Sequence, residues 1–285
     1  MQKVLAIDLD GTLLYPYSNK HRISSKNVKF LQHWIDAGNR VALVSSRDSK
    51  FLRSLEEDIG RPIDVIAGIG AHIEVDKKVI KHTSVNNKAL KKAIDFLDKY
   101  FHPLAYLLTT NEYPLIIRNN SIVSKFLMVF YKLTWYRQGK CREPFVLSND
   151  KFDEEVEKGE VVKLMTFFGL ARNKKKITKE INKIIREECS DIESSWTSIV
   201  NEITPGGCSK GAGVDYYCKY LKINPSDVYV VGDSGNDISM FNLYYENSYV
   251  MSKAYPSVKK YAKHVIRRVY KLDKLLLKEE TENAK

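Results

Sequence analysis

Residues Val4–Thr12 read VLAIDLDGT, a short apolar run that ends in an acid, followed by a second acid and a glycine. An apolar run of this length is typical of a strand buried on both faces, as in a parallel sheet. Alternate residues of an extended chain point to the same side, so the carboxylates of Asp8 and Asp10 are expected to meet. They would meet at the carboxyl edge of the sheet, where α/β proteins bind ligands, and Gly11 lets the chain turn there.

The residues that follow alternate between helical and strand patterns. Ser24–Ala37 is predicted to be a helix, because a serine can cap its start and Gly38 can end it. Val41–Ser45 and Asp64–Ala67 are predicted strands, with a helix over Lys50–Ile59 between them. This β-α-β-α-β order predicts an α/β fold with a Rossmann-like, doubly wound parallel sheet.

The middle of the chain follows a different pattern. Ile73–Ile80 alternates as a hairpin would, and residues 83–197 mix helices and strands as an α+β domain does. We expect one domain formed by residues 1–82 and 198–285, with residues 83–197 inserted as a second. Other expected helices are Asn86–Tyr100, Lys174–Cys189, Gly211–Leu221, Asp237–Asn242 and Pro256–Ala262. Other expected strands are Thr197–Ile203, Val228–Val231 and Tyr249–Met251.

The charge of the chain is strongly positive. Its 285 residues carry 46 Lys and Arg against 35 Asp and Glu, a net charge of +11. The excess lies in residues 83–197 (20 basic minus 15 acidic, +5) and 253–285 (10 minus 4, +6). Anionic small molecules, nucleic acid or an acidic membrane surface could match this charge, but a solvated lysine-rich surface explains it equally well.

Several classes of protein are excluded by composition. No metal-site spacing joins the four cysteines, so neither a disulfide scaffold nor a zinc site is expected. No apolar run is long enough for a membrane-spanning helix; the nearest approach is Phe126–Tyr136, which contains a lysine. The first residues show no secretory signal pattern. We therefore expect a cytoplasmic protein with no membrane partner.

Three further polar groups stand after predicted strands or at the start of a helix. Ser45-Ser46-Arg47 could bind phosphate oxygens, although serine is also a common helix cap. Lys210 stands at a helix start, where the helix dipole favours an anion, although a surface lysine is the commoner case. Gly232–Asp237 (GDSGND) places further acids at the sheet edge, and its last residue also fits a helix cap. Oxygen ligands from this edge would suit Mg²⁺.

The order of these four groups resembles the haloacid dehalogenase superfamily of phosphotransferases. IDLDGTLL, LVSSR, SKG and VGDSGNDISM are similar to its four motifs. The insert resembles the α+β cap of Cof-type, class IIB sugar-phosphate phosphatases, and Gly68–Ile73 (GIGAHI) is similar to the NGAxI segment of that branch. The resemblance covers the whole chain, and within the insert it is one of position and element order.

Two departures from the Cof pattern concern the phosphate loop. The branch usually has Thr-Gly-Arg where this chain has Ser45-Ser46-Arg47, so Ser46 adds a side chain beside the expected phosphate. It usually has Asn where this chain has Gly68. Neither change removes a catalytic group that the resemblance implies.

The resemblance implies chemical roles for three aspartates. Asp8 would be the nucleophile that forms an aspartyl-phosphate. Asp10 would protonate the leaving alcohol and then deprotonate the hydrolytic water. Asp8, the backbone carbonyl of Asp10, and Asp233 would hold Mg²⁺.

The remaining motif positions imply contacts to the phosphate and support for the site. Lys210 and the Ser45 hydroxyl would hold phosphate oxygens. Asn236 and Asp237 would orient Lys210 and the metal-bound waters, and Asn236 is also expected to contact substrate or phosphate. Further phosphate or substrate contacts are expected from Gly11, Thr12, Ser46 and Arg47.

The resulting expectation is a Mg²⁺-dependent phosphatase of small phosphorylated metabolites, sugar phosphates above all. It would be a monomer or homodimer with no nucleic-acid partner. A phosphomutase of the same superfamily and a non-catalytic phospho-ligand binding module remain open alternatives. Binding of nucleic acid or membrane through the basic C-terminal residues is a third, which would weaken steeply with salt. The substrate itself is not readable, because one scaffold serves many.

Overall fold

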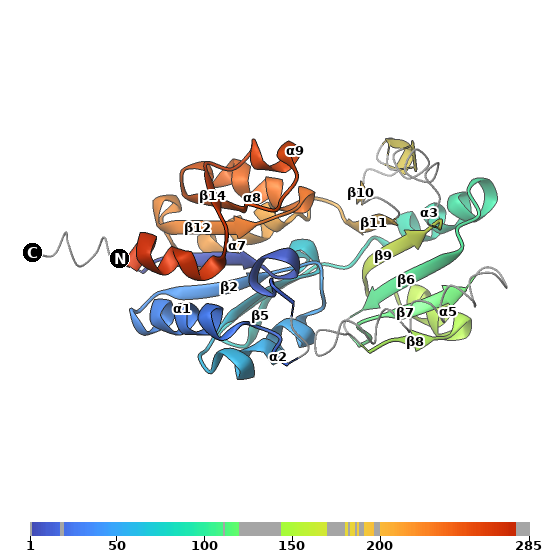
Figure 1. Ribbon diagram of the computed structural model, residues 1–285. Coiled ribbons are helices and arrows are strands. Elements are labelled where there is room, and N and C mark those ends of the chain that lie inside the picture. The colour runs from blue at the N-terminus through green and yellow to red at the C-terminus, as the bar shows by residue number, and fades with distance from the viewer. Residues whose placement is uncertain are drawn as a thin grey trace, which may run out of the picture. The chain divides into compact units, whose positions relative to one another are not determined.

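The computed structural model describes residues 2–17, 20–110, 112–119, 144–169, 180–181, 183–185, 187, 191–196 and 200–277. The apolar segment Phe126–Tyr136 and most of the expected helix Lys174–Cys189 lie outside these residues. The chain forms two compact units, one of Met1–His82 and Ser209–Lys285 and the other of Thr83–Cys208 (Figure 1).

The first unit is built on an eight-stranded sheet in the order β14-β13-β12-β1-β2-β3-β4-β5. The strands from β14 to β3 run parallel, and β4 and β5 continue the sheet as an antiparallel hairpin. The predicted Rossmann-like, doubly wound parallel sheet is therefore confirmed. The strands are β1 (Val4–Asp8), β2 (Arg40–Val44), β3 (Asp64–Ala67), β4 (His72–Val75), β5 (Lys78–His82), β12 (Val228–Gly232), β13 (Ser248–Met251) and β14 (His264–Ile266).

Helices cover both faces of this sheet (Figure 1). The helices α1 (Ser25–Asp36) and α2 (Ser49–Ile59) pack on one face, and α7 (Lys210–Leu221) and α8 (Ile238–Leu243) pack on the other. Every residue of β1 is buried, which explains why its sequence is apolar without alternation.

The ends of these helices follow from local sequence. Ser24 caps α1 by accepting a hydrogen bond from the backbone N–H of Asn27, as the sequence predicts. The short helix α9 (Pro256–Lys259) ends three residues before the expected Ala262. No helix in the described ranges combines the length and apolarity needed to cross a membrane.

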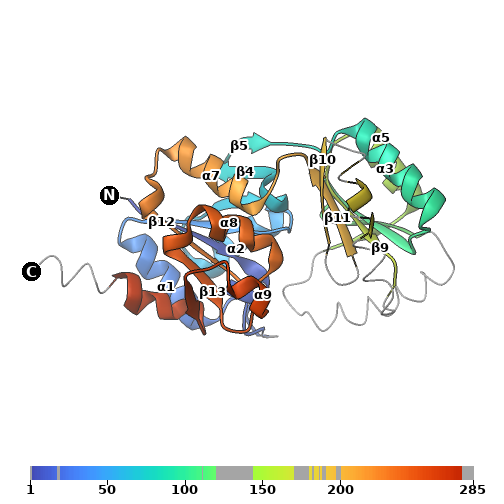
Figure 2. The ribbon, with the colours of Figure 1, turned by 90° about the horizontal axis from the view of Figure 1, so that it is seen from above.

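The second unit is built on a six-stranded sheet in the order β10-β11-β9-β6-β7-β8. The helices α3 (Asn87–Tyr100) and α5 (Asn149–Lys158) lie on the same side of it (Figure 2). Their apolar faces and one face of the sheet form a core of their own, separate from that of the first unit. The strands are β6 (Ala105–Thr110), β7 (Ile116–Asn119), β8 (Val146–Leu147), β9 (Val161–Phe167), β10 (Ile192–Trp196) and β11 (Val200–Pro205).

The second boundary between the units differs from the expected one. Sequence analysis placed residues 198–208 in the first domain, whereas the structure places them in the second unit. The reason is pairing: β11 forms antiparallel ladders with both β9 and β10. The chain therefore returns to the first unit only at Ser209, directly before α7.

A close approach between two glycines fixes the position of α7. Gly213 faces Gly70 so closely that a Cβ atom on Gly213 would lie 2.8 Å from the Gly70 Cα and from the Ile66 Cγ2. Real Cβ contacts are not this short, so only glycine fits. The loop Gly68–Gly70 and the first turns of α7 are thus packed backbone to backbone.

We predict that Gly213→Val lowers the free energy of unfolding by roughly 1–3 kcal/mol, because the new side chain overpacks this contact. Gly235→Val is the matched control, since a Cβ atom there meets nothing within 4 Å. Its expected change is within about 0.5 kcal/mol. Urea unfolding of both variants measures the difference, and equal stabilities would show that the glycine contact does not constrain α7.

Candidate active site

The four polar groups singled out in the sequence lie around the carboxyl ends of adjacent strands. Asp8 ends β1, Ser45 follows β2, and Asp233 follows β12. The strands β12, β1 and β2 are neighbours in the sheet, so these three residues leave the sheet at one edge. Lys210 is brought to the same place by α7, whose first residue it is.

Lys210 is completely enclosed at the centre of this site. Its side chain is 2% exposed, and its ammonium nitrogen lies 2.6 Å from Asp8 Oδ1 and 2.6 Å from Asp237 Oδ1. A buried lysine is costly unless it is paired, and here both partners are themselves buried carboxylates. Lys210 is therefore a buried lysine and not one of the commoner surface lysines.

Asp237 organises the loop that follows β12. Its Oδ2 accepts hydrogen bonds from the backbone N–H groups of Asp233 and Ser234, at 2.9 and 2.8 Å. Its Oδ1 binds Lys210, so one carboxylate ties the loop to the buried ammonium. The expected role of Asp237 in orienting Lys210 matches this geometry, whereas Asn236 accepts a hydrogen bond from the Ser234 hydroxyl instead.

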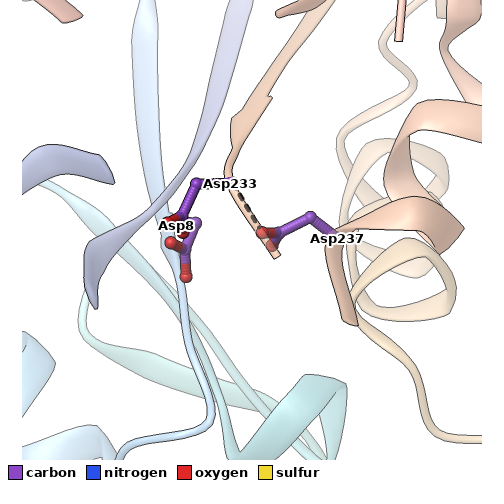
Figure 3. Close-up of side chains that lie close together, drawn as sticks. All are labelled: Asp8, Asp233 and Asp237. Carbon is purple, nitrogen blue, oxygen red and sulfur yellow. Dashed lines mark hydrogen bonds between the residues drawn. The ribbon is translucent and has the colours of Figure 1, made fainter. Parts of the chain in front are cut away.

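Asp8, Asp233 and Asp237 form a cluster of three carboxylates (Figure 3). One oxygen from each lies within 4.8 Å of the others. The Oδ2 atom of Asp8 is buried and, among the described residues, has no hydrogen-bond partner. A buried carboxylate oxygen without a partner favours the binding of a cation or a proton. Carboxylate oxygens are ligands that suit Mg²⁺. The cluster therefore fits a hard divalent cation.

The electrostatic environment follows from burial and charge. Burial raises the pKa of Asp8 to about 8, although Lys210 opposes the shift. Burial and the nearby Asp237 carboxylate also raise the pKa of Asp233. Burial alone would lower the pKa of Lys210, but Asp237 and Asp8 outweigh it and hold the ammonium charged. A cation bound by the cluster would favour the ionised form of Asp8.

The turn after β1 is fixed against the Asp233 carboxylate. Gly11 has a φ of +83°, and a Cβ atom there would lie 2.3 Å from Asp233 Oδ2. Thr12 is fully buried, and its hydroxyl lies 3.4 Å from Asp233 Oδ1. Gly11 and Thr12 therefore help to shape the acidic cluster.

Asp10 does not join this cluster, contrary to the expectation from extended-strand geometry. The strand ends at Asp8 and Leu9–Leu13 form a separate turn of helix, so the alternation of an extended strand does not continue to Asp10. The Asp10 carboxylate is bound by the Arg47 guanidinium through two hydrogen bonds of 2.6 and 2.8 Å. The Asp10 side chain remains 41% exposed.

The residues after β2 support this pair. Ser45 is buried, and its hydroxyl accepts a hydrogen bond from the backbone N–H of Arg47. The Arg47 guanidinium also stacks on the Phe51 ring, 4.3 Å from its centroid. Arg47, expected as a substrate contact, thus holds Asp10, while Ser46 is half-buried beside it.

One charged residue of the site, Lys253, was not predicted from the sequence. Lys253 follows β13, and its ammonium nitrogen lies 3.7 Å from Asp233 Oδ2. The signal was available, because Lys253 comes after the predicted strand Tyr249–Met251 just as the other groups follow theirs. Lysines are so common in this chain that the signal did not stand out.

The chain is similar in sequence to known hydrolases and phosphatases. The sequence profile of haloacid dehalogenase-like hydrolases matches residues 5–273. The 5-amino-6-(5-phospho-D-ribitylamino)uracil phosphatase YwtE of Bacillus subtilis is 26% identical over 259 residues, which is 85% of each chain.

Solved structures share the fold over nearly the whole length. The phosphatase BT1666 from Bacteroides thetaiotaomicron gives a TM-score of 0.75 at 22% identity, covering 97% of this chain and 94% of its own. The subclass IIB sugar phosphatase BT4131 gives 0.72 at 21% identity, covering 99% of both. The predicted fold and the predicted enzyme class, a phosphatase, are confirmed. With the profile matched from the first strand to the last described helix, this chain belongs to the haloacid dehalogenase-like hydrolases.

Proposed function

We propose that the protein is a Mg²⁺-dependent phosphatase of the Cof-type, class IIB branch, acting on small phosphorylated metabolites, sugar phosphates above all. The proposal rests on the surroundings of the two carboxylate oxygens of Asp8. One of its oxygens is bound by buried Lys210, and the other is buried without a partner among the described residues. A carboxylate so placed is positioned as a nucleophile beside a cation.

In the proposed reaction, a carboxylate oxygen of Asp8 attacks the substrate phosphorus in line. A new P–O bond to Asp8 forms as the bond to the leaving alcohol breaks, and Asp10 gives that alcohol a proton. Asp10 then takes a proton from water, whose oxygen attacks the aspartyl-phosphate, releasing inorganic phosphate and the free Asp8 carboxylate. The Asp10 carboxylate is 41% exposed, so a leaving alcohol and a water molecule can reach it.

The proposed metal ligands are Asp8, Asp233 and the backbone carbonyl of Asp10. Bound Mg²⁺ would neutralise charge on the transferred phosphoryl group. Asp237 belongs to the acidic cluster as well, but its oxygens are already taken by Lys210 and the loop N–H groups. We therefore assign Asp237 to the support of Lys210 and of the loop.

Phosphate oxygens are proposed to contact Lys210 and the Ser45 hydroxyl, which would hold the transferred group in line with Asp8. Gly11, Thr12, Ser46, Arg47 and Asn236 remain proposed supporting contacts, and several of them already have other partners, among them Thr12, whose hydroxyl lies 3.4 Å from Asp233 Oδ1. Arg47 binds Asp10, and Asn236 accepts a hydrogen bond from Ser234.

The second unit is the proposed source of substrate selection. It has a core and a sheet of its own, so its surface can vary without disturbing the site on the first unit. Sugar phosphates are favoured because BT4131, whose fold matches over 99% of both chains, is a sugar phosphatase. The relative YwtE is named as a phosphatase of 5-amino-6-(5-phospho-D-ribitylamino)uracil, which is also a small phosphorylated metabolite.

Phosphate release from a panel of sugar phosphates, nucleotides and p-nitrophenyl phosphate tests the reaction. We predict release with Mg²⁺, none with EDTA, and a fall of at least about a thousandfold in Asp8→Asn, because the amide cannot attack phosphorus. Wild-type turnover in that variant would contradict the nucleophile assignment. Transfer of phosphate within a sugar, without release, would indicate a mutase, and binding without turnover would indicate a binding module.

A second prediction concerns the metal ligands. Asp233→Asn removes a carboxylate charge and keeps the shape, so the affinity for Mg²⁺ is expected to fall at least about tenfold. Asp215→Asn is the control, since Asp215 pairs with Lys219 on the outer side of α7. Titration of Mg²⁺ by calorimetry measures both, and an unchanged affinity in Asp233→Asn would remove it from the ligand set.

A third prediction concerns pH. In metal-free protein the pKa of Asp8 is about 8, against an ordinary value of 3.8. Between these values the folded chain keeps a proton that the unfolded chain has lost, so the free energy of unfolding falls as pH rises from about 4 to about 8. Asp8→Asn should show a weaker fall. Urea unfolding in EDTA across this pH range measures the free energy of unfolding of both proteins. Parallel pH dependences for the wild type and Asp8→Asn would contradict the raised pKa of Asp8.

A further inference from the structure

The acidic cluster has a second lysine at its outer side. Lys210 pairs with Asp8 and Asp237, and Lys253 faces the third carboxylate, Asp233. The separation of Lys253 Nζ from Asp233 Oδ2, 3.7 Å, is that of an ion pair rather than of a hydrogen bond. The Lys253 side chain is 34% exposed, so its charge is only partly screened by solvent.

An aromatic side chain holds Lys253 in this position. Its ammonium nitrogen lies 3.9 Å from the centroid of the Tyr15 ring, and the Arg268 guanidinium lies 4.6 Å from the same centroid. Tyr15 belongs to the segment after β1, and Arg268 follows β14. Cation–π contacts of this kind restrain the end of a charged side chain, which would move freely if only water surrounded it. Lys253 therefore differs from the many lysines whose ends extend into water.

We propose that Lys253 is a built-in counter-cation of Asp233 that sets how strongly the acidic cluster takes up a divalent cation. The inference rests on the proposed function, because it assumes that Mg²⁺ binds at Asp233. A bound Mg²⁺ meets the repulsion of the fixed ammonium, which lowers its affinity. Without the metal, the ammonium offsets the charge that Asp233 brings next to two other carboxylates. Lys253 is thus a positioning residue that acts through Asp233.

Lys253→Met tests the charge, because methionine keeps an unbranched apolar stem against Tyr15. The probe is MgCl₂, titrated calorimetrically into the full chain at low ionic strength. Lys253→Met is expected to bind Mg²⁺ about tenfold more tightly than the wild type, because a repulsive charge near the ion is gone. Lys253→Arg keeps the charge and should bind within about twofold of the wild type. The advantage of the methionine variant should shrink at high ionic strength.

Lys260→Met is the matched control. Lys260 also stacks on a tyrosine, 4.9 Å from the Tyr261 ring centroid, and in the described part of the chain it has no ion pair with the cluster. Its Mg²⁺ affinity should equal that of the wild type. Lys253 and Lys260 are both exposed, so their substitution is expected to leave the fold intact. Urea unfolding establishes that each variant is folded.

The outcomes separate this inference from the function on which it rests. Equal or weaker Mg²⁺ binding by Lys253→Met than by the wild type would overturn the role of Lys253 and leave the metal site standing. An equal gain in the Met and Arg variants would also overturn it, because packing rather than charge would then be the cause. A folded wild type that takes up no Mg²⁺ would overturn the metal site itself, together with this inference.

Discussion

The ammonium group of Lys210 joins three parts of the chain that are far apart in sequence. It is supplied by the first residue of α7, and it binds Asp8 at the end of β1 and Asp237 beyond β12. Both carboxylates are buried, so each would be costly without this partner. The strand end, the helix start and the acidic loop are therefore mutually dependent, and the rest of the site is arranged around them.

The groups around Lys210 carry more negative than positive charge, and the proposed chemistry can use this excess. Three carboxylates face one buried ammonium, and burial raises the pKa of Asp8. A divalent cation or a proton must make up the difference. The positive charge of Lys253 partly does so from outside, at Asp233, where solvent weakens it. A bound cation, a proton on Asp8 and the Lys253 ammonium would therefore all offset the same excess of negative charge.

Much of the first unit is predictable from sequence because its elements are locally encoded. The apolar run Val4–Asp8 is a strand on its own evidence, and Ser24 caps α1 through a bond to a residue three positions away. Asp8, Lys210 and Asp233 could be identified because each stands at the end of a strand or at the start of a helix. In a parallel sheet such ends meet at one edge, whatever the loops between them.

Other features depend on partners that local sequence does not reveal. The segment 198–208 belongs to the second unit because β11 pairs with β9 and β10, and local sequence does not reveal this pairing. Asp10 lies outside the cluster of three carboxylates, and the Arg47 guanidinium binds it through two hydrogen bonds. Lys253 follows a predicted strand as the other site residues do, but the sequence does not show that it lies against Asp233.

By itself, therefore, the sequence determined the fold class, the family and the residues that carry charge to the sheet edge, because strand and helix patterns and motif order are local properties. The tertiary structure alone decided which of those charges meet. It buried Lys210 between two aspartates, grouped Asp8 with Asp233 and Asp237, and placed Lys253 against the cluster. Such pairings depend on how close separate segments pack, and distances of a few ångströms decide the strength of each charge interaction.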